Sequence, residues 1–142
     1  MEESLRDLLV NAGIGTFEGS SANAWNIWIG REPKLPDMAV VIARSGGTAP
    51  DPKWLLDYPA YQVRVRGPKG NYASALAKAE DVKDVLLGIT SQDINGHRLV
   101  SITMPSDITF VGFDENERPH FTLNFRLITE PAPTALSNRE AL

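Results

Sequence analysis

Two segments with alternating apolar and polar residues flank a helical segment, and together they limit the folds open to this chain. In YQVRVRG, residues 61–67, one tyrosine and two valines alternate with a glutamine and two arginines. The segment HFTLNFRLI, residues 120–128, alternates in the same way. Successive side chains of a β-strand point to opposite faces, so each segment predicts a strand with one apolar face. The run NYASALAKAEDVKDVLLG, residues 71–88, has an apolar stripe at helical spacing that is suited to covering that face.

Further elements are predicted around this unit. Apolar residues from Leu5 to Ala12 recur at helical spacing and predict a helix, with Ser4 as its cap and Gly13 as its stop. The dipeptide Asn95–Gly96 predicts a β-hairpin. Strands are expected over residues 25–30, 38–44, 97–104 and 108–113, and a loop over residues 14–24.

This order of elements predicts an α+β fold. We expect a mostly antiparallel sheet with two helices packed on one face. A chain of 142 residues is typical of a single domain. We expect that domain to span residues 1–129. The remaining residues, 130–142, contain two prolines and a polar end, which predicts a flexible C-terminal tail.

Composition excludes several classes of protein. The chain has no cysteine, so it has no disulfide framework, zinc–thiolate site or cysteine nucleophile. Its formal net charge of −4 argues against a protein that coats nucleic acid. The N-terminus lacks a basic region typical of a signal peptide, and no apolar run is long enough for a membrane span.

No catalytic or metal site is predicted. His97 and His120 each begin a strand and have no carboxylate at ligand spacing, which is typical of ordinary surface histidines. The acidic run at residues 114–117 lacks the spacing of a calcium loop and indicates a solvated hairpin turn. We therefore expect neither a cofactor nor enzymatic activity.

The long segment SGGTAPDPKWLLDYP, residues 45–59, is predicted to be an irregular loop. Loops of this length in a compact domain are usually functional or are ordered by a partner. Trp54, Leu55 and Leu56 are apolar and have no regular element to bury them. Either these residues pack against a neighbouring subunit, or the loop folds back on the edge of its own sheet.

The polar face of the predicted sheet carries three arginines. Arg64 and Arg66 lie on one predicted strand and Arg126 on another, all opposite the apolar side chains. In a monomer these arginines would be solvated. In an assembly they would contact acidic groups of another chain.

The order of these features resembles the tail terminator, or tail-completion, proteins of tailed bacteriophages, a group of small minor capsid proteins. The resemblance extends over about residues 4–128. Its most specific parts are YPAYQVRVRG with the helix that follows it, and DENERPHFTLNFRL. Such proteins form a ring, typically a hexamer, at the head-proximal end of the tail, where they stop tail-tube growth and join the tail to the head.

The resemblance implies a virion protein of the tail or neck, assembled in the host cytoplasm. Its expected partners are further copies of itself, the tail-tube protein and a head–tail connector or neck protein. Genome DNA would pass through the ring without specific binding, and no membrane would be involved. The candidates for contacts between subunits are Arg64, Arg66, Arg126, Trp54, Leu55 and Leu56.

Three other functions compete with this one. The first is a head-completion or connector protein of the neck. The second is a small-molecule-binding or enzymatic α+β domain that uses residues 45–59 as a lid. The third is a nucleic-acid-binding module with the three arginines on phosphates, which the net charge disfavours.

Overall fold

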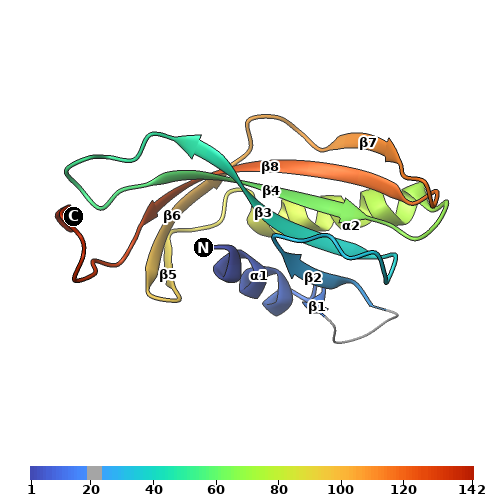
Figure 1. Ribbon diagram of the computed structural model, residues 1–142, viewed down its shortest axis with the longest axis horizontal. Coiled ribbons are helices and arrows are strands. Elements are labelled where there is room, and N and C mark those ends of the chain that lie inside the picture. Colours follow the sequence, from blue (N-terminus) through green and yellow to red (C-terminus); the bar gives the residue numbers. More distant parts are fainter. Residues whose placement is uncertain (19–23) are drawn as a thin grey trace.

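The α+β class is confirmed by a computed structural model, which describes residues 1–18 and 24–142. The described residues form two helices and one eight-stranded sheet (Figure 1). In chain order the elements are α1 (Glu2–Asn11), β1 (Thr16–Phe17), β2 (Asn26–Ile29), β3 (Ala39–Thr48), β4 (Tyr58–Arg66), α2 (Tyr72–Leu86), β5 (Gln92–Ile94), β6 (His97–Thr103), β7 (Thr109–Phe113) and β8 (Pro119–Glu130).

The sheet is mixed. Its strand order is β1-β2-β3-β4-β8-β6-β5, and β7 also pairs with β8. The pairs β1–β2 and β2–β3 are parallel, and the other pairs are antiparallel. Parallel pairing was not expected, because an apolar run such as residues 39–42 indicates burial without indicating the direction of its partner. β8 pairs with β4 along one edge and with β7 and then β6 along the other.

The core lies on the face of the sheet that the alternating pattern predicted. In the pairing of β4 with β8, Val63 lies opposite Leu123 and Tyr61 lies opposite Phe125, and these side chains are fully buried. They form one buried cluster with residues of both helices, including Leu5 and Leu9 of α1 and Ala75, Ala79, Val82 and Leu86 of α2.

The second helix starts where its cap residue predicted. Asn71 accepts a hydrogen bond from the backbone N–H of Ser74 at 3.0 Å, which satisfies a free donor of the first turn. Small residues bring this helix close to the sheet. A Cβ atom at Gly67 would lie only 2.6 Å from the Cβ of Ala75.

The predicted cap of the first helix is wrong. α1 begins at Glu2 after Met1, which makes no side-chain cap. Ser4 is instead buried within the helix, and its hydroxyl accepts a hydrogen bond from the Asn95 side chain at 3.2 Å. Asn95 belongs to the predicted Asn95–Gly96 hairpin, which is confirmed: both turn residues have positive φ, 49° and 79°, and join β5 to β6.

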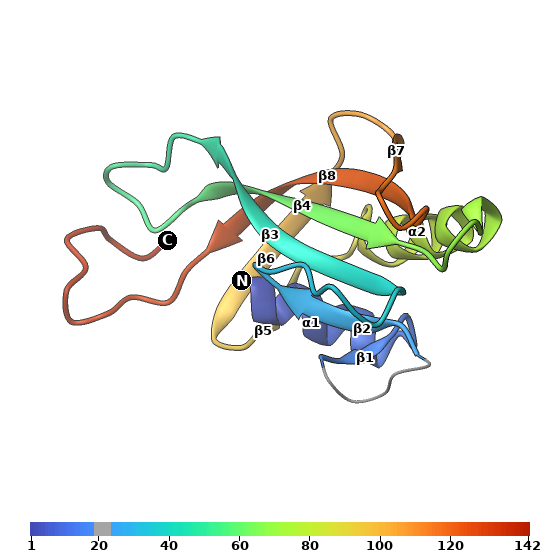
Figure 2. The same ribbon diagram turned by 45° about the vertical axis from the view of Figure 1, so that its right-hand side comes forward.

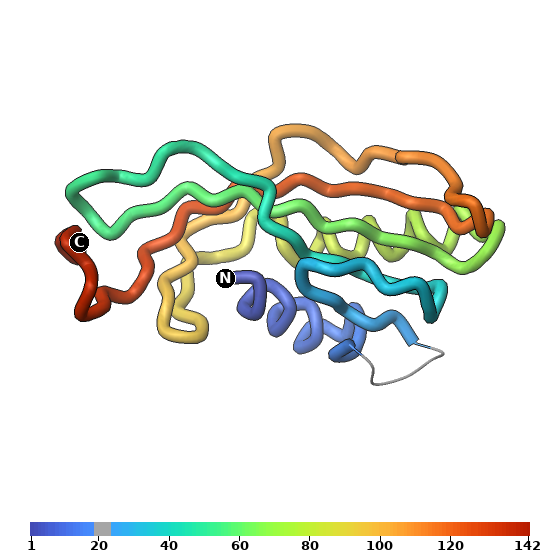
Figure 3. The backbone as a smooth tube through the Cα atoms, viewed as in Figure 1, coloured from blue at the N-terminus to red at the C-terminus, as the bar shows by residue number. Residues whose placement is uncertain are grey.

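β3 and β4 run beyond the rest of the sheet and carry an extension that we call the arm, residues 45–57 and 131–142. Figures 1 and 2 show the arm projecting at the end of the molecule away from α2. The tube in Figure 3 ends in the arm at the C-terminus, whereas the N-terminus lies near the middle. The expected loop over residues 45–59 is shorter than predicted, because β3 continues to Thr48 and β4 begins at Tyr58.

The predicted loop at residues 14–24 is only partly described. Thr16 and Phe17 form β1, which pairs with β2, so this part is not a loop. Residues 19–23 of that prediction lie outside the described residues.

Candidate assembly surfaces

All three candidate arginines lie on the outer face of the sheet, which is the face opposite the core, but only Arg64 and Arg126 are open to solvent there. In the β4–β8 pairing, Arg64 lies opposite Thr122 and Arg126 lies opposite Ala60. The Arg64 side chain is 41% exposed and has Glu32 as a distant ionic partner, at 3.8 Å. Arg126 is exposed, and its guanidinium makes no ion pair with any described residue.

The expectation that Arg66 shares this exposed face is wrong, because its side chain is only 2% exposed. A segment between β2 and β3 folds over this end of β4. The Arg66 guanidinium donates hydrogen bonds to the backbone carbonyls of Pro33, Pro36 and Asp37. Burial lowers the pKa of Arg66, and so does the nearby charge of Arg118. In this fold Arg66 anchors a connection and is not available at the surface.

A second arginine holds the same connection to the turn between β7 and β8. Arg118 is nearly buried and donates through Nε to the Asp114 carboxylate at 2.8 Å. Its Nη1 donates to the Lys34 carbonyl and lies 3.3 Å from the Asp37 carboxylate. His120 bridges Asp114 at 3.0 Å and Glu32 at 3.4 Å. The predicted acidic hairpin turn therefore contributes Asp114 to a largely buried ionic network.

Asp114 is held in its charged form. Burial acts to raise its pKa, but hydrogen bonds from His120 and from the backbone and side chain of Arg118 outweigh burial. The pKa of the Asp114 carboxyl therefore lies well below its usual range.

A groove runs over the outer face beside Arg126. Its volume is about 520 Å³. Most of its lining is apolar, with contributions from Ala60, Pro105 and Ile128 among others. Hydroxyl, amide and guanidinium groups of Thr48, Tyr58, Thr103, Asn124 and Arg126 are added to this apolar surface. The groove therefore suits a partner that offers apolar area together with an anionic group.

The apolar residues of the arm are less exposed than expected. Leu55 is only 3% exposed, and its backbone N–H donates to the Glu140 carbonyl at 2.8 Å. Asp57 and Thr129 exchange two backbone hydrogen bonds, of 2.9 and 3.0 Å. Asp57 thus continues the pairing of β4 with β8, and Leu55 is held to the C-terminal segment, while the arm itself projects from the sheet (Figure 1). Both alternatives considered for this segment stay predictions. Trp54 and Leu56 are half-buried, and their role in contacts between subunits stays a prediction.

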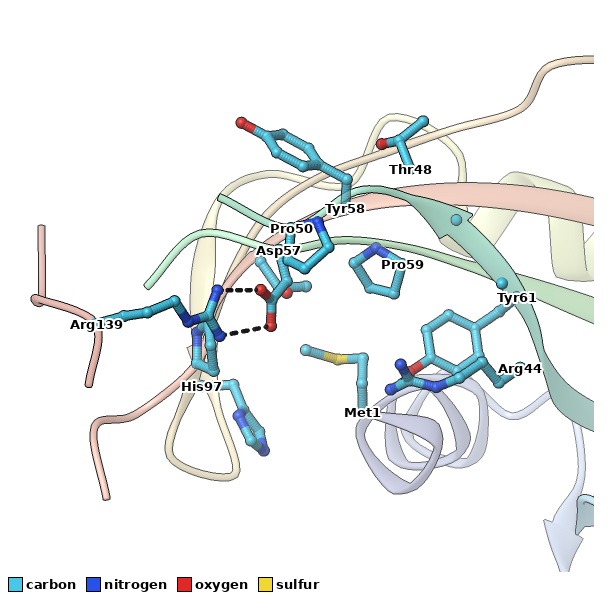
Figure 4. A pocket seen from close by; sticks show the side chains of 14 residues that line it. Met1, Arg44, Thr48, Pro50, Asp57, Tyr58, Pro59, Tyr61, His97 and Arg139 are labelled. Carbon is cyan, nitrogen blue, oxygen red and sulfur yellow. Dashed lines mark hydrogen bonds and ion pairs between the residues drawn. The ribbon is translucent and has the colours of Figure 1, made fainter. Parts of the chain in front are cut away.

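The C-terminal segment is attached to the arm. Arg139 Nη1 donates to the Asp57 carboxylate at 2.7 Å (Figure 4). The same nitrogen donates to the Asp51 carbonyl at 3.1 Å. The hydrogen bond to Asp57 raises the pKa of Arg139. That the segment is flexible, and that the domain ends at residue 129, stay predictions.

The cavity at the base of the arm has a volume of about 350 Å³. Arg139 is paired with Asp57, and Arg44 donates to the Tyr61 hydroxyl at 2.9 Å. His97 lines this cavity from the start of β6 (Figure 4). Over residues 1–18 and 24–142, no group of three or more histidines and carboxylates is arranged to hold a metal ion. In the same residues no helix is long and apolar enough to cross a membrane.

An exposed aromatic patch at β7 was missed by the sequence analysis. Tyr72, Phe110 and Phe113 are between 40% and 53% exposed, and Val111 is 58% exposed. The Phe110 ring lies 5.0 Å from Tyr72 and 5.5 Å from Phe113, centroid to centroid. The signal was present in TFVGF, where large apolar residues occupy both faces of a strand that can bury only one.

Comparison with known proteins gives this arrangement a context. The family model described as "Bacteriophage tail terminator protein" matches residues 8–131. No curated protein sequence matches the chain. Among solved structures, a chain from the virion of a native gene transfer agent particle has the same fold, with a TM-score of 0.68 and 19% sequence identity. The match covers 92% of this chain and 94% of that one. The chain belongs to the bacteriophage tail terminator family.

Proposed function

We propose that this protein forms a ring at the head-proximal end of a phage tail, where it stops growth of the tail tube and joins the tail to the head. The observation that carries the proposal is the family match over residues 8–131, which includes all eight described strands, α2 and the last turn of α1. As a structural component of the tail and neck, a minor capsid protein in the broad sense, the protein would act by binding and not by catalysis.

The surfaces of the chain support an assembly role. A subunit of a closed ring needs two different surfaces, because each contact joins one surface to another on the next copy. The β7 patch is one candidate surface, because it exposes three aromatic side chains and aromatic residues are enriched at the centres of protein interfaces. The outer face offers a second surface, the groove beside Arg126, whose guanidinium makes no ion pair with the residues that the structure describes.

The proposed partners follow from the proposed position of the protein between the tail and the head. The ring would consist of copies of this chain, with six as the expected number. One side of the ring would contact the tail-tube protein and the other the head–tail connector. The genome would pass through the lumen, where a net charge of −4 per subunit disfavours binding of DNA. Assembly would take place in the host cytoplasm.

A complementation experiment tests this function. A phage that lacks the gene is expected to make tails of excessive and variable length that do not join heads, and the intact gene supplied in the host is expected to restore uniform tails. Electron microscopy measures tail length and joining. Tails of normal length beside unjoined heads would replace this proposal by the head-completion or connector function.

A further inference from the structure

We propose that the ring closes through an asymmetric contact in which the exposed face of α2 in one subunit docks on the Arg126 groove of the next subunit. This inference rests on the proposed function, since it assigns the two surfaces that such a ring requires. The occupant of the groove is therefore a second copy of this chain.

The exposed face of α2 is acidic and is not used within the subunit. Glu80, Asp81 and Asp84 are all exposed, and they form no ion pair with the residues that the structure describes. Ala73 and Ala77 continue the same exposed stripe toward the start of the helix. Because alanine side chains are short, another backbone can approach this part of α2 closely.

Exposed aromatic side chains lie beside the acidic face of α2, at the start of the helix. Tyr72 begins α2, and its ring packs edge-on against Phe110 of β7 at a centroid distance of 5.0 Å. Phe110 and Phe113 are both partly exposed beside it. One continuous surface therefore offers apolar area at the start of α2 and negative charge toward its end. That combination is typical of an interface with an apolar centre and a charged rim.

The groove on the outer face carries one positive charge, that of Arg126, which has no ionic partner among the described residues. Arg64 lines a different hollow of the same face, together with Glu32. Tyr58 and Asn124 add hydrogen-bonding groups to the floor of the groove. Carboxylates of a neighbouring α2 would give Arg126 the paired, hydrogen-bonded environment that a buried guanidinium requires.

The positions of the two surfaces suit a ring. α2 packs on the core side of the sheet, whereas Arg126 lies on the opposite side. A subunit therefore cannot satisfy its own groove with its own helix. A contact between two different surfaces repeats from copy to copy, and it closes into a ring when the rotation between copies allows.

Cysteine cross-linking in particles tests the contact directly, and this chain adds no native cysteine to the background. A phage lacking the gene is complemented with the double variant Ala77→Cys and Thr103→Cys, which places one thiol on the exposed face of α2 and one in the groove and keeps the charged residues of both surfaces. Purified particles are treated with a short bis-maleimide, and we expect a ladder of cross-linked multimers on a denaturing gel. The matched control combines Thr103→Cys with Glu3→Cys, a substitution at an exposed acid on the other helix, and is expected to stay monomeric.

Charge reversal supplies a second, independent readout. Arg126→Glu is expected to lower the yield of infectious particles at least about tenfold, because it places like charges together. Adding Asp84→Arg to Arg126→Glu is expected to recover most of that loss, whereas adding Glu3→Arg is not. A recovery that is equal for the two second substitutions, or absent for both, would overturn the proposed contact.

The two proposals fail in different ways. Particles with uniform tails that contain the double cysteine variant but give no ladder would overturn this contact and leave the ring function standing. If the gene is dispensable for uniform tail length and for head joining, the proposed function itself is wrong.

Discussion

Arg64 and Arg66 lie two residues apart on the same face of β4, yet they have different environments. Arg64 is 41% exposed with one distant ionic partner, whereas Arg66 is 2% exposed and donates to three backbone carbonyls. The difference comes from the covering segment that contains Pro33 and Pro36, about thirty positions earlier in the chain. Alternation along a strand identifies a face, but it does not reveal what covers that face.

The first prediction compares these two arginines. Arg66→Ala should lower the free energy of unfolding by about 3–5 kcal/mol, because it removes a buried cation and leaves the backbone carbonyls that accept from it without their donor. Arg64→Ala should lower the free energy of unfolding by about 1 kcal/mol or less, as is usual for exposed charged residues. Urea denaturation of both variants measures the difference. Equal costs would mean that the covering segment does not depend on Arg66.

The second prediction concerns Asp114 and acid. Its pKa is depressed in the folded state, so its stabilising effect is fully present above the unfolded pKa of roughly 4 and is lost as the pH falls below that value. Asp114→Asn should reduce stability at pH 7 by about 2–3 kcal/mol, since hydrogen bonds to a charged group are lost. It should also flatten the fall in stability below pH 4. Denaturant midpoints across pH measure both effects, and an unchanged acid slope would contradict the assignment.

At the scale of elements, the chain's local patterns identified most helices and strands but not all their partners. The α2 cap at Asn71 and the Asn95–Gly96 turn depend on neighbouring residues, and both were predicted. The parallel pairing of β2 with β3 and the cover over Arg66 depend on distant residues, and both were missed. Among the candidate site residues, Arg64 and Arg126 lie on the expected face, while Arg66 and Leu55 are buried.

The third prediction concerns the arm as an element. Arg139 ties the C-terminal segment to residues 51–57 through Asp57 and two backbone carbonyls. Arg139→Ala should therefore speed hydrogen exchange in residues 49–57 with little change in the global unfolding midpoint, because the arm lies outside the buried cluster. Hydrogen exchange followed by mass spectrometry measures the exchange rate of residues 49–57. The control is Lys83→Ala, which removes a surface ion pair with Asp107 at α2, away from the arm (Figure 1), and should leave the arm unchanged.

At the scale of the whole molecule, the chain presents surfaces of different chemistry on opposite sides. The β7 patch and the acidic face of α2 lie with the helix layer, and the arginines lie on the outer face of the sheet. Two different surfaces on opposite sides favour head-to-tail contacts that repeat from copy to copy over a symmetric contact between two identical surfaces.

The fourth prediction therefore concerns association and salt. We expect the isolated protein to be a monomer or weak oligomer, and a six-fold ring in the particle. Any association in solution should weaken between about 0.1 M and 1 M salt, as the Debye length falls from roughly 10 Å to 3 Å. Sedimentation at several concentrations measures this. Association that strengthens with salt would assign the contact to the aromatic patch alone.

The position of β8 in the sheet has a consequence for how the protein is made. β8 is the last strand of the chain, yet it lies between β4 on one side and β6 and β7 on the other. While the ribosome is still translating residues 119–130, the earlier strands have no central partner and the core stays open. The Arg126 groove, which is lined by residues of β8 together with residues of β3 and β4, therefore cannot exist before β8 has left the ribosome and entered the sheet.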